Sequence, residues 1–229
     1  MEPLDNPVWH ALTGPQATVA EGTDRARRYR SEYSVFAAIP DDPDQAAWDE
    51  LRALVGDDGH ALLVPELSPP ADWERLGSFA VHQMVGARPV RVNDPAPVVA
   101  LDADDVADMA ELVALAQPGP WAERTHELGD FFGVRDDNGR LVAMAGQRMH
   151  LADAVEISAV ACHPDARGRG YAAAVIGATV DAITERHKVP MLHVRHDNDA
   201  AIRVYERLGF VIRTTFDVGM YHARVPSVP

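Results

Sequence analysis

A glycine-rich turn is the first feature of the sequence that could do chemistry. Its residues Arg167, Gly168, Arg169 and Gly170 lie between an apolar run that ends at Cys162 and a stretch of helix-forming residues. A strand, a glycine turn and a helix start place unpaired backbone N–H groups around one concavity, where the helix dipole also favours an anion. The turn therefore predicts a phosphate site, and a plain tight turn with two solvated arginines is the alternative.

The turn matches neither of two common nucleotide-binding loops. A Walker loop needs Gly-x-x-x-x-Gly-Lys-Ser/Thr, and a dinucleotide fingerprint needs three glycines at Gly-x-Gly-x-x-Gly spacing. A nucleoside-triphosphate enzyme or a nicotinamide enzyme is therefore disfavoured.

A second feature joins an amide to a phenol further along the chain. Asn198 precedes a predicted helix that contains Tyr205 and that Gly209 closes at the favoured C′ position. Seven positions separate Asn198 from Tyr205, which is close to two helical turns, so both side chains project from one side. The phenol could donate a proton to a leaving group while the amide holds a ligand. Alternatively, Asn198 caps the helix and Tyr205 packs in the core.

Taken in series, the two features resemble the signatures of the GNAT superfamily of N-acetyltransferases. The family's phosphate motif, Arg/Gln-x-x-Gly-x-Gly/Ala, is met by Arg167, Gly170 and Ala172. Its later signature, Asn-x-x-Ala-x-x-x-Tyr-x-x-x-Gly-Phe, is met by Asn198, Ala201, Tyr205, Gly209 and Phe210. The resemblance covers about residues 97–221 and implies the acyl-CoA N-acyltransferase fold. That fold is an α/β (α+β) structure with a mixed, mostly antiparallel central sheet flanked by helices.

The resemblance also implies how acetyl-CoA, the expected cosubstrate, would be held. Backbone groups of Val160, Ala161 and Cys162 would pair with the pantetheine arm where two strands separate. Asn198 would contact the pantetheine, and Tyr205 would lie near the thioester sulfur. The pyrophosphate would lie on the turn, whose residues are Arg167, Gly168, Arg169, Gly170, Tyr171 and Ala172.

The implied reaction is attack of an amine on the thioester carbonyl, for which the amine must first lose a proton. Glu156 is the candidate base, because lysine-acetylating members of the family carry a glutamate at this distance before the phosphate turn. Strand alternation places Glu156 on the face of Ser158 and Val160, where burial would raise its pKa toward the working range. A structural carboxylate bound to an arginine, or a water chain to another residue, is the alternative. Tyr205 is the candidate acid toward the departing thiolate.

The thiol and the histidines near these features are assigned no chemistry. Cys162 is interpreted as a strand thiol rather than a nucleophile, because nothing pairs it with a base. His193 and His196 would fall on opposite faces of a strand or its end, so no metal is expected. Candidate acceptor contacts follow the first helix of this half and are Trp121, Arg124, Thr125, His126 and Glu127, although a plain surface helix explains them equally well.

The elements that must position these residues follow from periodicity and turn signals. In the second half we expect a helix after Asp102 or Asp104, and a hairpin across the Asn138-Gly139 pair. Further strands are expected at 155–162 and 191–194. The first half is interpreted as mixed α/β, with strands at 17–20, 35–39 and 61–64 and a helix at 44–55.

Proline-rich stretches at 86–89 and 94–97 mark the predicted domain boundary. Residues 1–90 would form an N-terminal α/β domain, either a degenerate GNAT-like half or a lid. Residues 91–229 would form the N-acetyltransferase domain. Because the first half lacks a phosphate turn of its own, we expect one CoA site per chain.

Composition and net charge limit the classes of partner that the chain is expected to bind. The 229-residue chain has a formal net charge of −14, so it lacks the basic face that nucleic-acid binders usually present. The acidity would attract a cationic amine, or would simply keep the protein soluble. Without a membrane-length apolar run or a secretion signal, and with a single cysteine, a cytoplasmic protein without membrane contact is the default expectation. The expected acceptor is a small-molecule or protein amine, with a homodimer as one arrangement. A CoA-binding sensor without turnover is the competing function.

Overall fold

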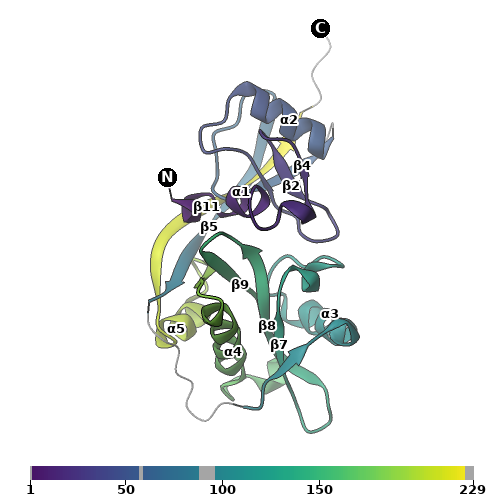
Figure 1. The fold of residues 1–229 in the computed structure, drawn as a ribbon, viewed down its shortest axis with the longest axis vertical. Helices are drawn as coiled ribbons and strands as arrows, with labels where there is room; N and C mark the ends of the chain where they lie inside the picture. Colours follow the sequence, from purple (N-terminus) through teal and green to yellow (C-terminus); the bar gives the residue numbers. More distant parts are fainter. Residues whose placement is uncertain (1, 57–58, 88–95, 225–229) are drawn as a thin grey trace. The chain divides into compact units, whose positions relative to one another are not determined.

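The computed structural model describes residues 2–56, 59–87 and 96–224, shown in Figure 1. The chain divides into two compact units, each assembled from separated segments. Unit 1 comprises residues 1–81, 150–152 and 215–229, and unit 2 comprises residues 82–149 and 153–214. The predicted boundary lies largely outside the described residues. The division differs from a single cut near residue 90, because the C-terminal stretch belongs to unit 1.

Unit 2 contains most of a large mixed sheet, whose strands run in the order β11-β5-β10-β9-β8-β7-β6. Neighbouring strands β6 and β7, and likewise β7 and β8, pair antiparallel, whereas β9 and β10 pair parallel. The strands are β5 (Trp73–Gly86), β6 (Val99–Leu101), β7 (Phe131–Arg135), β8 (Leu141–His150), β9 (Ala154–Cys162), β10 (Val189–Arg195) and β11 (Phe210–Ala223). Both β5 and β11 contribute residues to both units.

Helices cover both faces of this sheet in unit 2 (Figure 1). The helix α4 (Tyr171–Glu185) packs on β7, β9 and β10, and α5 (Asp199–Arg207) lies on the same side through the shared apolar cluster. The helix α3 (Val106–Ala116) packs on the other face, where Met109 and Leu112 meet Met144. Its entry is the short 3₁₀ helix Ala103–Asp105, capped by Asp102 as expected. The fold is therefore the predicted one.

Unit 1 is a smaller α/β assembly. Its three-stranded antiparallel sheet consists of β1 (Ala20–Gly22), β2 (Arg27–Tyr29) and β3 (Ala37–Ala38), and β4 (His60–Leu63) pairs with the C-terminal part of β11. Its helices are α1 (Pro7–Leu12) and α2 (Gln45–Val55). The core includes Trp48, Trp73 and Tyr221, and the Trp48 ring centroid lies 5.4 Å from that of Trp73 and 5.7 Å from that of Tyr221.

The largest departures from the sequence-based expectations lie in the first half. The helix at 44–55 is confirmed, and Asp44 caps it by accepting from the Ala47 N–H. The expected strand at 17–20 is instead a 3₁₀ turn over Ala17–Val19 that leads into β1. The long strand β5 was not predicted, because charged residues, serine and glycine interrupt its apolar alternation. Among the described residues, no helix has the length and hydropathy needed to span a bilayer.

Candidate active site

The predicted phosphate turn lies in the connection between β9 and α4. Gly168 and Gly170 adopt left-handed backbone angles, with φ of 77° and 79°, which side-chain-bearing residues rarely adopt. A Cβ at either position would meet no atom within 4 Å, so the glycines serve the turn's conformation and leave open space above it. Gly170 is the N-cap of α4 and offers no side chain to the first N–H groups of the helix.

The charge on this turn is also available to a ligand. Arg167 and Arg169 are exposed, and neither forms an ion pair with any residue that the structure describes. Uncapped N–H groups, the positive end of a 15-residue helix and two unpaired guanidinium groups fit a diphosphate. The residues present therefore suit the pyrophosphate of CoA, and their assignment to it stays a prediction.

Strands β9 and β10 separate beside this turn. Their parallel pairing covers Ala154 to Glu156 opposite Val189 to Met191, and beyond it β9 runs on to Cys162 and β10 to Arg195. Unpaired backbone groups on two diverging strands fit an extended amide-bearing chain, which pairs like a further strand. The separation is compatible with pantetheine contacts at Val160, Ala161 and Cys162, which stay a prediction.

Ala159 interrupts the alternation of β9. Its φ is 51°, in the left-handed region, and the residues after it change faces. Val155, Ile157 and Val160 contact the cluster beneath α4 and α5, whereas Ala159 and Ala161 contact the cluster beneath α3. The prediction that Glu156 shares a face with Val160 is therefore wrong, because simple alternation does not survive the kink.

Tyr205 lies on the α4 and α5 side of the sheet. Its ring packs in the same cluster as Leu192 and Val194 and meets the Phe210 ring edge-on at 6.1 Å between centroids. Burial raises its pKa to about 12, so the phenol keeps its proton at neutral pH. Within the described residues its hydroxyl has no hydrogen-bond partner. An O–H donor without a protein acceptor is available to a ligand atom.

Asn198 has the structural role that the sequence left as an alternative. Its side chain caps α5 by accepting from the Ala201 N–H at 3.1 Å. The amide N–H₂ group of Asn198 stays available, so the predicted pantetheine contact is compatible with the cap but remains a prediction.

Glu156 is buried on the opposite, α3 side and is fully paired. Arg148 donates two hydrogen bonds to its two oxygens at 2.8 and 2.7 Å, and Nδ1 of His193 lies 2.8 Å from Oε1. Burial by itself would raise the pKa of Glu156, but the Arg148 charge and the hydrogen bonds from His193 and Arg148 outweigh it and lower the pKa to about 2. The expected raised pKa is wrong, because the strand beside β9 supplies a guanidinium.

The hydrogen bonding continues beyond His193 to two residues, Gln83 and Arg213, that no sequence motif indicates. Nε2 of His193 lies 3.1 Å from the side-chain nitrogen of Gln83, which is fully buried. Arg213 donates to the side-chain oxygen of Gln83 at 3.0 Å. We call these five residues, Arg148, Glu156, His193, Gln83 and Arg213, the polar network. One signal was available for His193, since a histidine interrupts the apolar run Met191-Leu192-His193-Val194.

Other candidates have local structural roles. Burial raises the pKa of the Cys162 thiol, which keeps it in its unreactive form. In the expected acceptor segment, Arg124 forms an ion pair with Glu127, and the buried Thr125 hydroxyl accepts from the Ala122 N–H. The described residues contain no group of three or more His, Cys, Asp or Glu side chains arranged to hold a metal.

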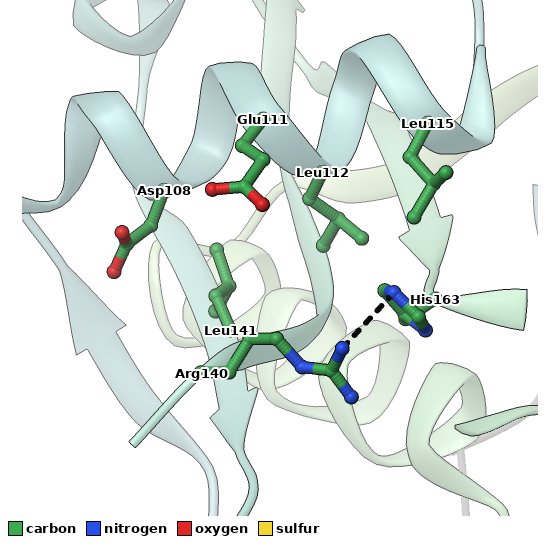
Figure 2. Close-up of a pocket in the computed structure, with 7 residues that line it drawn as sticks. All are labelled: Asp108, Glu111, Leu112, Leu115, Arg140, Leu141 and His163. Carbon is green, nitrogen blue, oxygen red and sulfur yellow. Dashed lines mark hydrogen bonds between the residues drawn. The ribbon is translucent and has the colours of Figure 1, made fainter. Parts of the chain in front are cut away.

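A hollow beside α3 is shown in Figure 2. Arg140 reaches across it to Nε2 of His163 at 3.3 Å and also pairs with Asp136. None of the predicted site residues lines it. The lining residues are Asp108, Glu111, Leu112, Leu115, Arg140, Leu141 and His163.

Comparison with known proteins agrees with this geometry. Residues 132–217 match the family model described as FR47-like protein. A mycothiol acetyltransferase of Mycolicibacterium vanbaalenii is 30% identical over 164 residues, which is 65% of this chain and 49% of that protein. An acetyltransferase of Yersinia pestis is 36% identical over 94 residues, which is 39% of this chain and 64% of that protein. The chain spans only about a third to a half of the mycothiol acetyltransferases it matches.

Solved structures extend the likeness over nearly the whole chain. A GCN5-related N-acetyltransferase from Kribbella flavida shares the fold at a TM-score of 0.62 and 17% identity, covering 96% of this chain and 95% of that one. A crystal structure from Novosphingobium aromaticivorans, assigned to the GNAT acetyltransferases, has a TM-score of 0.88 and 37% identity, covering 98% of this chain and all of that one. At that identity and coverage, the chain belongs to the GNAT superfamily of acetyltransferases.

Proposed function

We propose that the chain transfers the acetyl group of acetyl-CoA to a primary amine. The observation that carries this proposal is the adjacency of two features in unit 2. The strands β9 and β10 separate beyond Glu156, and β9 then leads into the uncapped, glycine-shaped start of α4. Diverging strands suit the pantetheine arm, and the helix start suits the pyrophosphate.

The two faces of the sheet at the strand separation carry different groups, one suited to the leaving thiolate and the other to the attacking amine. Tyr205 lies on the α4 and α5 side, where its O–H can donate to the thioester sulfur. With a pKa near 12, above the ordinary thiol value of about 8.5, the phenol stabilises the leaving thiolate by a hydrogen bond rather than by giving up its proton outright. The amine would approach from the α3 side, where Glu156 and His193 lie.

Backbone N–H groups near Val160 would stabilise the negative charge that develops on the thioester carbonyl oxygen. The kink at Ala159 redirects the peptide groups that precede Val160, at the place where the carbonyl oxygen of the thioester would lie. An N–H aimed at the developing negative charge lowers the barrier to acyl transfer. The residues that bind acetyl-CoA are proposed to be those predicted above, from Val160 to Cys162 and from Arg167 to Ala172, together with Asn198.

The test is a thiol-release assay with acetyl-CoA and a panel of amines that includes small metabolite amines and peptides with free amino groups. We expect amine-dependent release of CoA and an acetylated product by mass spectrometry. Acetyl-CoA binding without release for any amine would favour the competing function, a CoA-binding sensor. Failure to bind acetyl-CoA would contradict both acetyl transfer and the sensor function.

A further inference from the structure

Glu156 is poorly suited to be the base that the amine needs. Both of its oxygens accept from Arg148, and its side chain is 1% exposed. To take a proton, this carboxylate would have to give up charge-assisted hydrogen bonds from Arg148, whereas Nε2 of His193 would give up one neutral hydrogen bond from Gln83. The His193 imidazole beside it is better suited, since a neutral imidazole has one lone-pair nitrogen that can accept a proton.

The polar network determines which nitrogen of His193 carries the proton. Arg213 is donor-only, so the Gln83 side chain must turn its oxygen toward Arg213 and its N–H₂ group toward His193. Nε2 of His193 must then accept from Gln83, and Nδ1 must carry the proton and donate it to Glu156. The assignment yields a neutral imidazole with its lone pair on Nε2.

His193 also lies where a base is needed. The pairing of β9 with β10 ends at Met191, and His193 follows two residues later on the separating part of β10. Its neighbours Leu192 and Val194 face the cluster that contains Tyr205, so His193 points to the opposite face. A thioester lying between the strands would have the phenol on one side and this imidazole on the other.

We propose that Nε2 of His193 is the proton acceptor for the attacking amine, with Glu156 as the residue that positions and stabilises it. This inference rests on the proposed function. The ammonium ion of the substrate gives one proton to Nε2. The freed lone pair forms the C–N bond as the C–S bond breaks, and the departing sulfur takes the second proton that the nitrogen loses. The imidazolium then releases its proton to solvent.

The charged groups around the imidazole suit this role. Glu156 faces Nδ1 from β9 and would stabilise the imidazolium, much as a buried carboxylate does in a catalytic triad. Arg148 reaches Glu156 from β8 and keeps it ionised. Arg213 on β11 bonds to Gln83, so the Gln83 side chain lies between Arg213 and the imidazole. In the unliganded state the Gln83 N–H₂ group occupies the hydrogen-bonding position that the amine would take.

The main test compares His193→Asn with the matched control His187→Asn. The Asn amide nitrogen lies near the position of Nδ1 and keeps a donor for Glu156, but it cannot take a proton. With the amine found in the thiol-release assay, we expect kcat/KM at pH 7 to fall about 100-fold in His193→Asn, with acetyl-CoA affinity unchanged. His187 is exposed at the end of α4, in a left-handed conformation that asparagine tolerates, and its substitution should leave kcat/KM unchanged.

Gln83→Glu gives a readout that a purely structural role would not move. The new carboxylate can still accept from Arg213, but it would face Nε2 and favour the imidazolium. The acid limb of kcat/KM should therefore shift to higher pH by about one unit. An unchanged limb in Gln83→Glu, or wild-type kinetics in His193→Asn, would overturn the inference while leaving acetyl transfer intact.

A spectroscopic measurement needs no turnover. In protein labelled uniformly with ¹³C and ¹⁵N, the ring signals of His193, assigned among the 10 histidines by their correlation to the His193 backbone, should show a proton on Nδ1 and an unprotonated Nε2 at neutral pH. A proton on Nε2 would overturn the inference, even if His193→Asn proved unable to fold. If instead the wild type acetylates no amine but shows this tautomer, the proposed function fails and the base assignment fails with it.

Discussion

Polar groups in the polar network are paired within the protein, whereas several donors on the α4 side of unit 2 are not. In the network, Arg148, Glu156, His193 and Gln83 are paired with one another deep in the sheet. On the other side, the first turn of α4 and the Tyr205 hydroxyl form what we call the open region, where donors lack described protein partners. Solvent can satisfy such accessible donors in the free protein, and a ligand can take the place of that solvent.

The comparison separates effects on stability from effects on function. Substitutions in the network should act first on the free energy of unfolding. Substitutions in the open region should act on ligand binding or turnover and leave stability nearly unchanged.

Arg148→Met should be the most damaging change. It leaves the Glu156 carboxylate buried with only the hydrogen bond from His193, and stranding a buried charge costs about 3–5 kcal/mol. Arg140→Met is the control, because Arg140 is about half exposed and its surface pair with Asp136 is worth about 1 kcal/mol at most. Urea denaturation measures both. Equal losses in the two variants would contradict the distinction between network and surface.

The stability of the wild type should depend on pH through Glu156. Its folded pKa of about 2 lies below the ordinary value of 4.5, so its ionised form stabilises the fold above pH 4.5. That contribution, roughly 3 kcal/mol, is lost as pH falls from 4.5 toward 2. Unfolding free energies of the wild type and Glu156→Gln, measured across this window, should therefore converge at low pH. Curves that stay parallel would show that Glu156 is not held ionised.

Tyr205→Phe should lower kcat by about 100-fold while changing acetyl-CoA affinity less than about twofold. Its stability should stay within about 0.5 kcal/mol of wild type, because the lost hydroxyl has no described protein partner. Tyr221→Phe is the opposite case, since that hydroxyl donates to the Leu67 carbonyl and accepts from the Leu67 N–H. It should cost about 1 kcal/mol of stability with turnover unchanged. Steady-state kinetics and thermal unfolding of both variants decide whether the unpaired hydroxyl is the functional one.

Gly170→Ala should weaken acetyl-CoA binding about tenfold. Alanine disfavours the left-handed backbone by about 1–2 kcal/mol, so the turn would relax and move its N–H groups away from the pyrophosphate. Gly139→Ala imposes the same strain in the β7–β8 hairpin, where φ is 81° and a Cβ would also meet open space. Calorimetric titration should show weaker binding in the first variant only. Similar affinities would mean that the turn's conformation does not matter for the ligand.

Local features were predictable from the sequence because their causes are local. The helix α2 with its Asp44 cap, the hairpin at Asn138-Gly139 and the strand–turn–helix unit around Gly170 each depend on neighbours within a few positions. The same holds for α5, whose start at Asn198 and end before Gly209 follow from capping chemistry. The two motifs were enough to recognise the family because both lie in segments whose structure depends on neighbouring residues.

Only the tertiary structure decided the chemistry on the other side of the sheet. The polar network draws one residue each from β5, β8, β9, β10 and β11, so no sequence spacing brings its members together. The pKa of Glu156 depends on an arginine from the neighbouring strand, and the face of Val160 depends on a kink at Ala159. The proposed acetyl-CoA site could be predicted from the sequence, because backbone donors in one loop would suffice to hold a diphosphate. Which side chain can take a proton depends on charges that strand pairing assembles from distant parts of the chain.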